Sequence, residues 1–422
     1  MAAHPFDLRL RAATPGLLAL PWQEPLSHWD CTEVPLRDIP VGPSRHLVRF
    51  VEADGSLWAL KELPERIALK EYGVLRDLEA RSLPAVRAAG LVIQPEDNAI
   101  LLTRYLDRSW QYRRLLMRLP WDSSPHLDRL LDAMAGLLVE LHRNGVFWGD
   151  CSLANTLFSR DGQVLQAWLV DAETSEIHPQ LSNGQRNHDL DILVENVAGG
   201  LLDLAVRMEQ DEETYPELFE RAQSVAERYR ALWDVLHAES VFAPGDRYAV
   251  ESRIRALQDL GFGVDEVNVQ AGGDDRLRLK MAVAARRYHA ALLHNLTGLD
   301  VGEGQARILL ADLRAHESRL QQTGPLAALR WSADVLGPGA ARAHQALGGI
   351  GDPIQAYCDL LEVRWLLSEQ AQQDVGETAA LEALAQRAIP AGSAAQMAVA
   401  DASTGQLQAL TPALIKEMSN PD

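Results

Sequence analysis

The chain has little cysteine, little lysine and no long apolar run, and each shortage narrows what the protein can be. Among 422 residues there are three cysteines, which are odd in number and far apart, so they do not suggest a disulfide framework. This use of cysteine is typical of a reducing compartment, and we expect a cytoplasmic protein. No apolar run approaches the roughly 18 residues of a membrane helix, so we expect no membrane span.

Basic residues are outnumbered by acidic ones, 40 against 59, which gives a net charge of −19. Such a surface argues against nucleic-acid binding, and any anionic ligand needs a local basic site. Only four lysines occur: Lys61, Lys70, Lys280 and Lys416. A lysine within a candidate active-site motif is therefore less readily explained by chance. A second candidate site for an anionic ligand is an arginine cluster, for which a solvated helix face is the alternative: Arg108, Arg113, Arg114 and Arg118.

The length predicts two or three domains, at roughly 150 residues each. We divide the chain into an irregular N-terminal arm (1–44), a first domain (45–243), a mostly helical C-terminal domain (244–367) and a weakly ordered tail rich in Ala and Gln (368–422). The break near residue 244 rests on the turn-forming sequence Phe242-Ala243-Pro244-Gly245-Asp246.

Local patterns predict an α+β fold for the first domain. Asp54-Gly55 lies between two apolar runs and predicts a β-hairpin, and a second hairpin is expected around 91–103. A helix is expected between them, at about 64–81. These elements form a first lobe at 45–106. The second lobe, 107–243, begins with a clearly periodic helix that ends at Asn144-Gly145 and precedes a third hairpin.

Five polar residues occur in the order that phosphoryl transfer requires. Asp150 and Asn155 lie in the loop after the long helix, and Asp171 ends an apolar strand. Lys61 ends an earlier strand, and Glu71 lies on the helix that follows. In such chemistry a carboxylate accepts the proton of the acceptor hydroxyl, an amide and a second carboxylate hold Mg²⁺, and a lysine contacts the phosphates of ATP.

This pattern assigns a role to each residue. Asp150 is the predicted catalytic carboxylate, and Asn155 and Asp171 are the predicted Mg²⁺ ligands. Lys61 is the predicted phosphate contact, and Glu71 is expected to hold it. Because Lys61 and Glu71 are close in sequence, Glu79 is an alternative partner.

The motifs around these residues resemble those of the protein-kinase-like superfamily, in the branch of lipopolysaccharide sugar kinases and aminoglycoside phosphotransferases. The similar segments are Gly149-Asp150 with Asn155, Leu169-Val170-Asp171, and Trp58-Ala59-Leu60-Lys61. The resemblance implies a two-lobed kinase-like domain whose hinge, near Thr103 and Tyr105, would receive the adenine. The C-terminal part resembles an uncharacterised bacterial domain found fused to such kinase-like domains.

The sequence also departs from that family. Trp148 stands where a histidine is usual, and Ala172-Glu173 follows Asp171 in place of Phe-Gly. No glycine-rich G-x-G-x-x-G loop precedes Lys61. The residues that could cover the phosphates in its place are at 41–45, where Ser44 and Arg45 supply polar groups.

The leading hypothesis is an enzyme, an ATP- and Mg²⁺-dependent kinase that phosphorylates a hydroxyl of a sugar or other small molecule. The departures motivate an alternative, a pseudokinase or nucleotide-binding regulatory module whose C-terminal domain binds a partner. A third hypothesis keeps ATP binding but transfers AMP to a protein. The sequence does not identify the small-molecule or protein acceptor.

Overall fold

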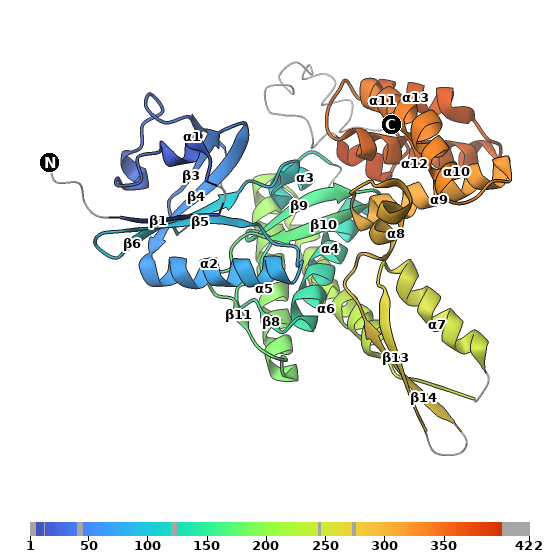
Figure 1. Ribbon diagram of the computed structural model, residues 1–422, viewed down its shortest axis with the longest axis horizontal. Coiled ribbons are helices and arrows are strands. Elements are labelled where there is room, and N and C mark those ends of the chain that lie inside the picture. Colours follow the sequence, from blue (N-terminus) through green and yellow to red (C-terminus); the bar gives the residue numbers. More distant parts are fainter. Residues whose placement is uncertain are drawn as a thin grey trace. The chain divides into compact units, whose positions relative to one another are not determined.

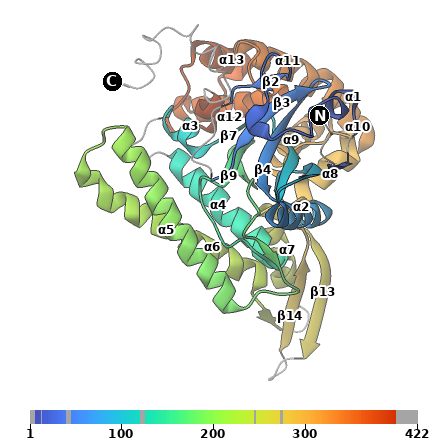
Figure 2. The same cartoon turned by 90° about the vertical axis from the view of Figure 1, so that its left-hand side faces the viewer.

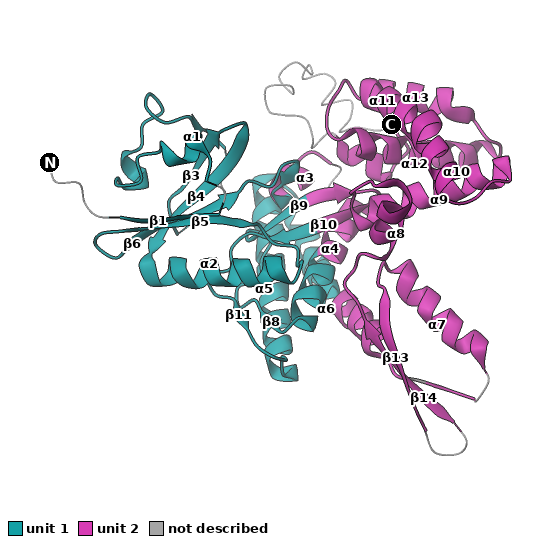
Figure 3. Cartoon of the chain, viewed as in Figure 1, with its two compact units in different colours: residues 1–112, 134–158, 167–226 teal, residues 113–133, 159–166, 227–422 magenta. Residues whose placement is uncertain are grey.

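The computed structural model describes residues 6–11, 13–39, 45–119, 125–243, 246–271 and 276–398. The chain forms two compact units (Figure 3). The first contains residues 1–112, 134–158 and 167–226, and the second contains 113–133, 159–166 and 227–422. The kinase-like motifs lie in the first unit.

The first unit is built on a six-stranded antiparallel sheet with the order β1-β5-β6-β4-β3-β2. Both predicted hairpins are confirmed, and the turn of the first has positive φ at Asp54 (50°) and Gly55 (72°), as a tight Asp-Gly turn requires. The strands are β1 (Asp7–Leu10), β2 (Leu36–Arg37), β3 (Val48–Ala53), β4 (Ser56–Pro64), β5 (Ala88–Gln94) and β6 (Asn98–Arg104).

Helix α2 (Glu65–Ala80) confirms the helix predicted between the hairpins and lies against this sheet (Figure 1). Its buried side chains recur at three- and four-residue spacing, the pattern of a helix with one face on a core. One of them is a carboxylate, Glu71, which is only 1% exposed. A carboxylate on the buried face of a helix needs a hydrogen-bond donor or a positive charge beside it, and Lys61 of β4 supplies both.

The N-terminal arm is more ordered than its irregular sequence suggested. Strand β1 adds to the sheet beside β5, and the arm also contains α1 (Pro15–Leu18) and the 3₁₀ helix η1 (Leu26–His28). The buried arm residues Leu17, Trp22 and Leu26 join one hydrophobic core with Val51 and Trp58 of the sheet. Apolar burial therefore orders a segment that has no internal periodicity.

In the region predicted as the second lobe, the candidate loop lies between short strands. Strand β8 (Val146–Phe147) pairs with β11 (Glu176–Ile177), and the loop from Trp148 to Asn155 follows β8 directly. The predicted third hairpin is confirmed as β9 (Thr156–Asp161) and β10 (Val164–Leu169). The remaining elements are β7 (Ser109–Trp110), α3 (Tyr112–Leu116), α4 (Pro125–Arg143), α5 (Asn183–Arg207), η2 (Glu212–Thr214) and α6 (Tyr215–His237).

The second unit contains a small antiparallel sheet and a helical core. Strands β13 (Val264–Ala271) and β14 (Leu277–Val283) form a long ribbon that can be followed in Figure 2, with β12 (Ser240–Phe242) on the other side of β14. Helix α7 (Arg247–Asp259) precedes the ribbon. The helical core contains α8 (Tyr288–Thr297), α9 (Glu303–Leu320), α10 (Pro325–Trp331), a π-helical turn η3 (Ser332–Leu336), α11 (Gly337–Ala346), α12 (Pro353–Ala371) and α13 (Gly376–Gln386).

The predicted fold class, α+β with a mostly helical C-terminal part, is confirmed. The predicted tail at 368–422 is described as far as Ala398, and this part contains α13 and the 3₁₀ helix η4 (Ala394–Met397), whose Leu384 and Ala395 are buried in the helical core. None of the described helices is long and apolar enough to cross a membrane.

Candidate active site

Lys61 lies among three carboxylates of the first unit. Its Nζ is 3.1 Å from Glu71 Oε2, 2.7 Å from Asp171 Oδ2 and 3.6 Å from Glu173 Oε2. Strand β4 brings the lysine to this point, and α2 turns Glu71 toward it. The alternative partner Glu79 instead forms an ion pair with Arg11. The structure therefore joins Lys61 with Glu71 and with the end of β10, more than one hundred residues away.

Burial and charge act in opposite directions in this cluster. Burial lowers the pKa of Lys61, but the charges of Glu71 and Asp171 outweigh it, so the pKa of Lys61 is raised. Burial, with a further contribution from the charge of Asp171, raises the pKa of Glu71 to about 7, against the opposing effect of Lys61. The lysine therefore stays charged at neutral pH, whereas the carboxyl group of Glu71 gains and loses its proton near neutral pH.

The segment after β10 is tied to the same cluster. The backbone N–H of Ala172 donates to Glu71 Oε1 (3.2 Å), and the N–H of Glu173 donates to Asp171 Oδ1 (3.1 Å). Nε2 of His46 lies 3.2 Å from Glu173 Oε2. These contacts fix the two acidic side chains at the end of the strand relative to α2.

Among the described residues, Glu71, Asp171 and Glu173 each offer an oxygen within 4.8 Å of the others, which is a donor set suited to a hard divalent cation. Sequence reasoning noted Glu173 only as a departure from the family and missed it as a candidate ligand. The available signal was its spacing, because residues two apart on an extended segment project to the same side.

Asp150 and Asn155 contact each other across the loop. Nδ2 of Asn155 donates to Asp150 Oδ2 (3.0 Å) and to the Asp150 carbonyl (3.2 Å), and the Asn155 N–H donates to Ser152 Oγ (3.1 Å). The Asn155 carbonyl accepts from the N–H of Val170 (3.1 Å), the residue before Asp171. The loop is thereby attached to the strand end that carries Asp171.

A buried aspartate holds this loop in place. Asp189, on α5, is fully buried and accepts the backbone N–H groups of Trp148 and Gly149, each at 2.8 Å. Nε2 of His142 lies 3.0 Å from the same carboxylate, and burial lowers the pKa of this imidazole. Trp148 is itself fully buried, so the residue in the usual histidine position packs in the core while its backbone anchors the loop.

The predicted adenine-binding hinge lies at the end of β6. Thr103 pairs with Ala59 of β4, and the N–H of Tyr105 donates to the Leu57 carbonyl (3.0 Å). The hinge N–H of Tyr105 is therefore already engaged in this conformation. Of the predicted phosphate-covering pair, Ser44 lies outside the described residues and Arg45 is exposed.

The predicted arginine cluster is divided between a turn and a helix. Arg108 is exposed in the turn before β7, with a φ of 55°, and the other three are half-buried on or just after α3. Burial, and then the charge of Arg114, lowers the pKa of Arg118. Two of these cations thus influence each other, and their role as an anion site stays a prediction.

Comparison with known proteins agrees with the resemblance found in the sequence. Residues 52–214 match the lipopolysaccharide kinase (Kdo/WaaP) family, and residues 231–389 match a domain of unknown function, DUF4032. A solved structure of WaaP in complex with acyl carrier protein is 20% identical and covers 45% of this chain and 88% of that chain, with a TM-score of 0.31. A comparison with curated proteins gives no match. The resemblance to lipopolysaccharide kinases and to a C-terminal domain found fused to them is confirmed, and the family match supports a kinase-type phosphotransferase.

Proposed function

We propose that the kinase-family segment is an ATP- and Mg²⁺-dependent phosphotransferase that acts in the cytoplasm on a hydroxyl of a sugar or other small molecule. The observation that carries this proposal is the position of Lys61, whose ammonium lies between Glu71 and Asp171. A lysine held by a helix glutamate beside a strand-end aspartate is the arrangement that kinases use at the nucleotide phosphates.

Each residue of the cluster has a task in this proposal. Asp171 and Asn155 hold the metal, with Glu173 as a further carboxylate close enough to share it. Bound Mg²⁺ would neutralise charge on the transferred phosphoryl group. Lys61 contacts the phosphates, and Glu71 keeps it in position.

Asp150 serves as the proton acceptor. Asn155 donates to Oδ2 of this carboxylate, which orients it, and within the described part of the chain no hydrogen bond occupies Oδ1. The acceptor hydroxyl would donate to Oδ1 and lose its proton there as its oxygen attacks the γ-phosphorus of ATP, and ADP would leave as the bond from that phosphorus to the β,γ-bridging oxygen breaks. A positioned carboxylate of this kind contributes about 10²–10⁴-fold to the rate.

The test is ATP binding and turnover by the full chain with Mg²⁺, in wild type, Asp150→Ala and Asp171→Ala. Asp191→Ala is a matched control, since Asp191 is exposed on α5. Asp150→Ala should bind ATP but lose turnover by about 100-fold or more, and Asp171→Ala should lose Mg²⁺-dependent binding. A wild-type protein that neither binds ATP nor is stabilised by it would overturn the proposal.

The second candidate is a pseudokinase that binds nucleotide without transferring phosphate. It is motivated by two departures from the kinase pattern: Trp148 stands where a histidine is usual, and no glycine-rich G-x-G-x-x-G loop precedes Lys61. Binding of ATP with turnover that Asp150→Ala does not change would support it. Product analysis separates the third candidate, because AMP transfer releases pyrophosphate and phosphoryl transfer releases ADP.

A further inference from the structure

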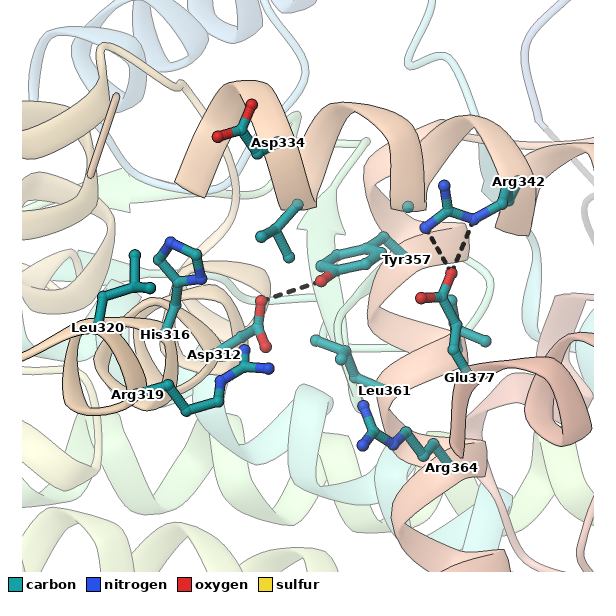
Figure 4. A pocket seen from close by; sticks show the side chains of 13 residues that line it. Asp312, His316, Arg319, Leu320, Asp334, Arg342, Tyr357, Leu361, Arg364 and Glu377 are labelled. Atoms are coloured by element: carbon teal, nitrogen blue, oxygen red, sulfur yellow. Dashed lines mark hydrogen bonds and ion pairs between the residues drawn. The ribbon is translucent and has the colours of Figure 1, made fainter. Parts of the chain in front are cut away.

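A pocket of about 380 Å³, lined by both charged and apolar side chains, lies within the helical core of the second unit (Figure 4). Its lining comes from α9, η3, α11, α12 and α13, between Asp312 and Glu377. The volume is within the range of about 300–1,000 Å³ that is usual for small-molecule sites. None of its lining residues belongs to the Lys61 cluster, so the pocket is independent of the function proposed above.

The helical segment from α10 to α11 is distorted at the turn that lines the pocket. Residues Ser332–Leu336 form a π-helical turn, and Pro338 follows two residues later. Proline has no N–H to donate to the carbonyl four residues earlier, which here is that of Asp334, and its ring crowds that carbonyl. The widened turn brings Asp334 to the pocket. π-turns of this kind are frequent at functional sites.

A glycine shapes the same wall. A Cβ on Gly339 would lie 2.4 Å from the ring of Tyr357, so only glycine allows this close approach. The Tyr357 hydroxyl donates to Asp312 Oδ2 (2.9 Å), which also accepts from Trp331 Nε1 (2.7 Å). Burial, together with the charge of Asp312, raises the pKa of Tyr357, so the tyrosine remains a donor. Asp312 is therefore held rigidly, with its other oxygen Oδ1 still able to accept.

The cationic groups of the pocket are less constrained. Arg319 forms no ion pair with any described residue, and Nε2 of His316 is buried with no hydrogen-bond partner in that part of the chain. Arg364 pairs with Asp374, whose side chain is 63% exposed. Two nitrogens of Arg364 donate to this carboxylate, but because Asp374 is open to solvent, it can be released to water when another anion binds Arg364.

We propose that this pocket binds a small organic oxyanion, a phosphate or carboxylate, that also carries hydroxyl groups. Arg319 and Arg364 would bind the anionic group, with His316 as a further donor. Asp334 and Oδ1 of Asp312 would accept from the hydroxyls. The two carboxylates disfavour a bare inorganic anion, and an apolar ligand would leave the buried Nε2 of His316 without a hydrogen-bond partner.

The test is isothermal titration calorimetry of the full chain with three probes: glycerol 3-phosphate, glycerate and inorganic phosphate. Either organic probe should bind saturably and more tightly than inorganic phosphate, and comparison of the two identifies phosphate or carboxylate as the preferred group. Arg319→Gln should weaken binding by at least about tenfold, the effect of losing one charge-assisted hydrogen bond. Arg314→Gln, an exposed arginine on α9 outside the pocket, should bind as wild type does.

Two further variants make the result specific to this pocket. Asp334→Asn should reduce the preference for glycerol 3-phosphate over inorganic phosphate, because it weakens the acceptor for the hydroxyls while it removes a charge that repels both anions. Lys61→Ala should leave this binding unchanged, whereas loss of binding there would place the probe in the kinase-like site. No saturable binding by any of the probes at millimolar concentration, or equal affinities of Arg319→Gln and Arg314→Gln, would overturn the proposal.

Discussion

The ammonium of Lys61 lies 2.7 Å from the carboxylate of Asp171, although the two residues are 110 positions apart in the chain. Lys61 is held at the same time by Glu71, at 3.1 Å. The lysine therefore joins β4, α2 and the end of β10 through a single side chain. Removal of this charge leaves three carboxylates facing one another, which is the premise of the first prediction.

Lys61→Ala should reduce ATP turnover by about 10²–10³-fold, the usual effect of removing one preorganised electrostatic group. It should also weaken nucleotide binding, because the clustered carboxylates then repel the phosphates. Turnover and ATP affinity are to be measured in the same preparation. Lys280→Ala is the control, since Lys280 is exposed on β14. Equal turnover in the two variants would remove Lys61 from the proposed site.

The raised pKa of Glu71 predicts a specific pH dependence of stability. Its ordinary value is 4.5, and in the folded protein it is about 7. The folded state therefore binds more protons than the unfolded state between these values, so this group's contribution is complete below about pH 4.5 and is lost as pH rises through 7. The Glu71→Gln variant has no ionisable side chain at this position, so it lacks this contribution to the pH dependence of stability.

The free energy of unfolding, measured by denaturant titration at several pH values, checks this. The stability of Glu71→Gln relative to wild type should increase steadily from about pH 4.5 to pH 7 and then level off. Asp77→Asn, which is exposed on the same helix α2, is the control and should run parallel to wild type. A constant difference between Glu71→Gln and wild type across that window would contradict the raised pKa.

The sequence predicted those parts of the fold that local patterns determine. The hairpin at Asp54-Gly55 follows from the conformational preferences of those two residues. Helix α2 follows from apolar residues at three- and four-residue spacing within its own segment. The order of Lys61, Glu71 and Asp171 was also readable, because each ends or follows a recognisable element.

Long-range contacts could not be read in this way. The pairing of β1 with β5 joins residues about eighty positions apart and leaves no periodic trace in the N-terminal arm. The pocket around Asp312 and Tyr357 combines four α-helices and a π-helical turn, whose individual sequences show only which face is apolar. Such contacts depend on how elements pack together, and no single segment records that packing.

The next prediction concerns Gly304, at the start of α9, where the backbone of Asp161 comes very close to the helix. Asp161 caps this helix by accepting the N–H groups of Gly304 and Gln305, each at 2.8 Å. A Cβ on Gly304 would lie 2.1 Å from the Asp161 carbonyl oxygen, so Gly304→Ala must displace backbone. We expect a loss of about 1–3 kcal/mol in the free energy of unfolding.

The matched substitution is Gly199→Ala on α5, where an added Cβ meets nothing within 4 Å. Alanine there should stabilise by up to about 1 kcal/mol, because it has the higher helix propensity. Thermal unfolding followed by circular dichroism should thus shift in opposite directions for the two variants. Shifts of the same sign would show that the Asp161 contact does not constrain Gly304.

The buried ion pair between Arg160 and Asp359 gives the last prediction. The two side chains are only 3% and 1% exposed, and one of their bonds, from Arg160 Nη1 to Asp359 Oδ2, measures 2.9 Å. Gln355 Nε2 donates to the other carboxylate oxygen (3.1 Å). Asp359→Ala leaves a buried guanidinium without its counter-charge, which should cost about 3–5 kcal/mol of unfolding free energy.

The double variant Arg160→Met with Asp359→Leu removes both charges and should recover most of that loss, because apolar side chains of similar size replace a pair whose desolvation is itself costly. Asp374→Ala, which breaks the exposed pair with Arg364, should change stability little. Denaturant unfolding of the three variants decides between two explanations. If the double variant is as unstable as Asp359→Ala, the pair itself stabilises the fold. If it recovers, the loss in the single variant comes from the unpaired buried charge.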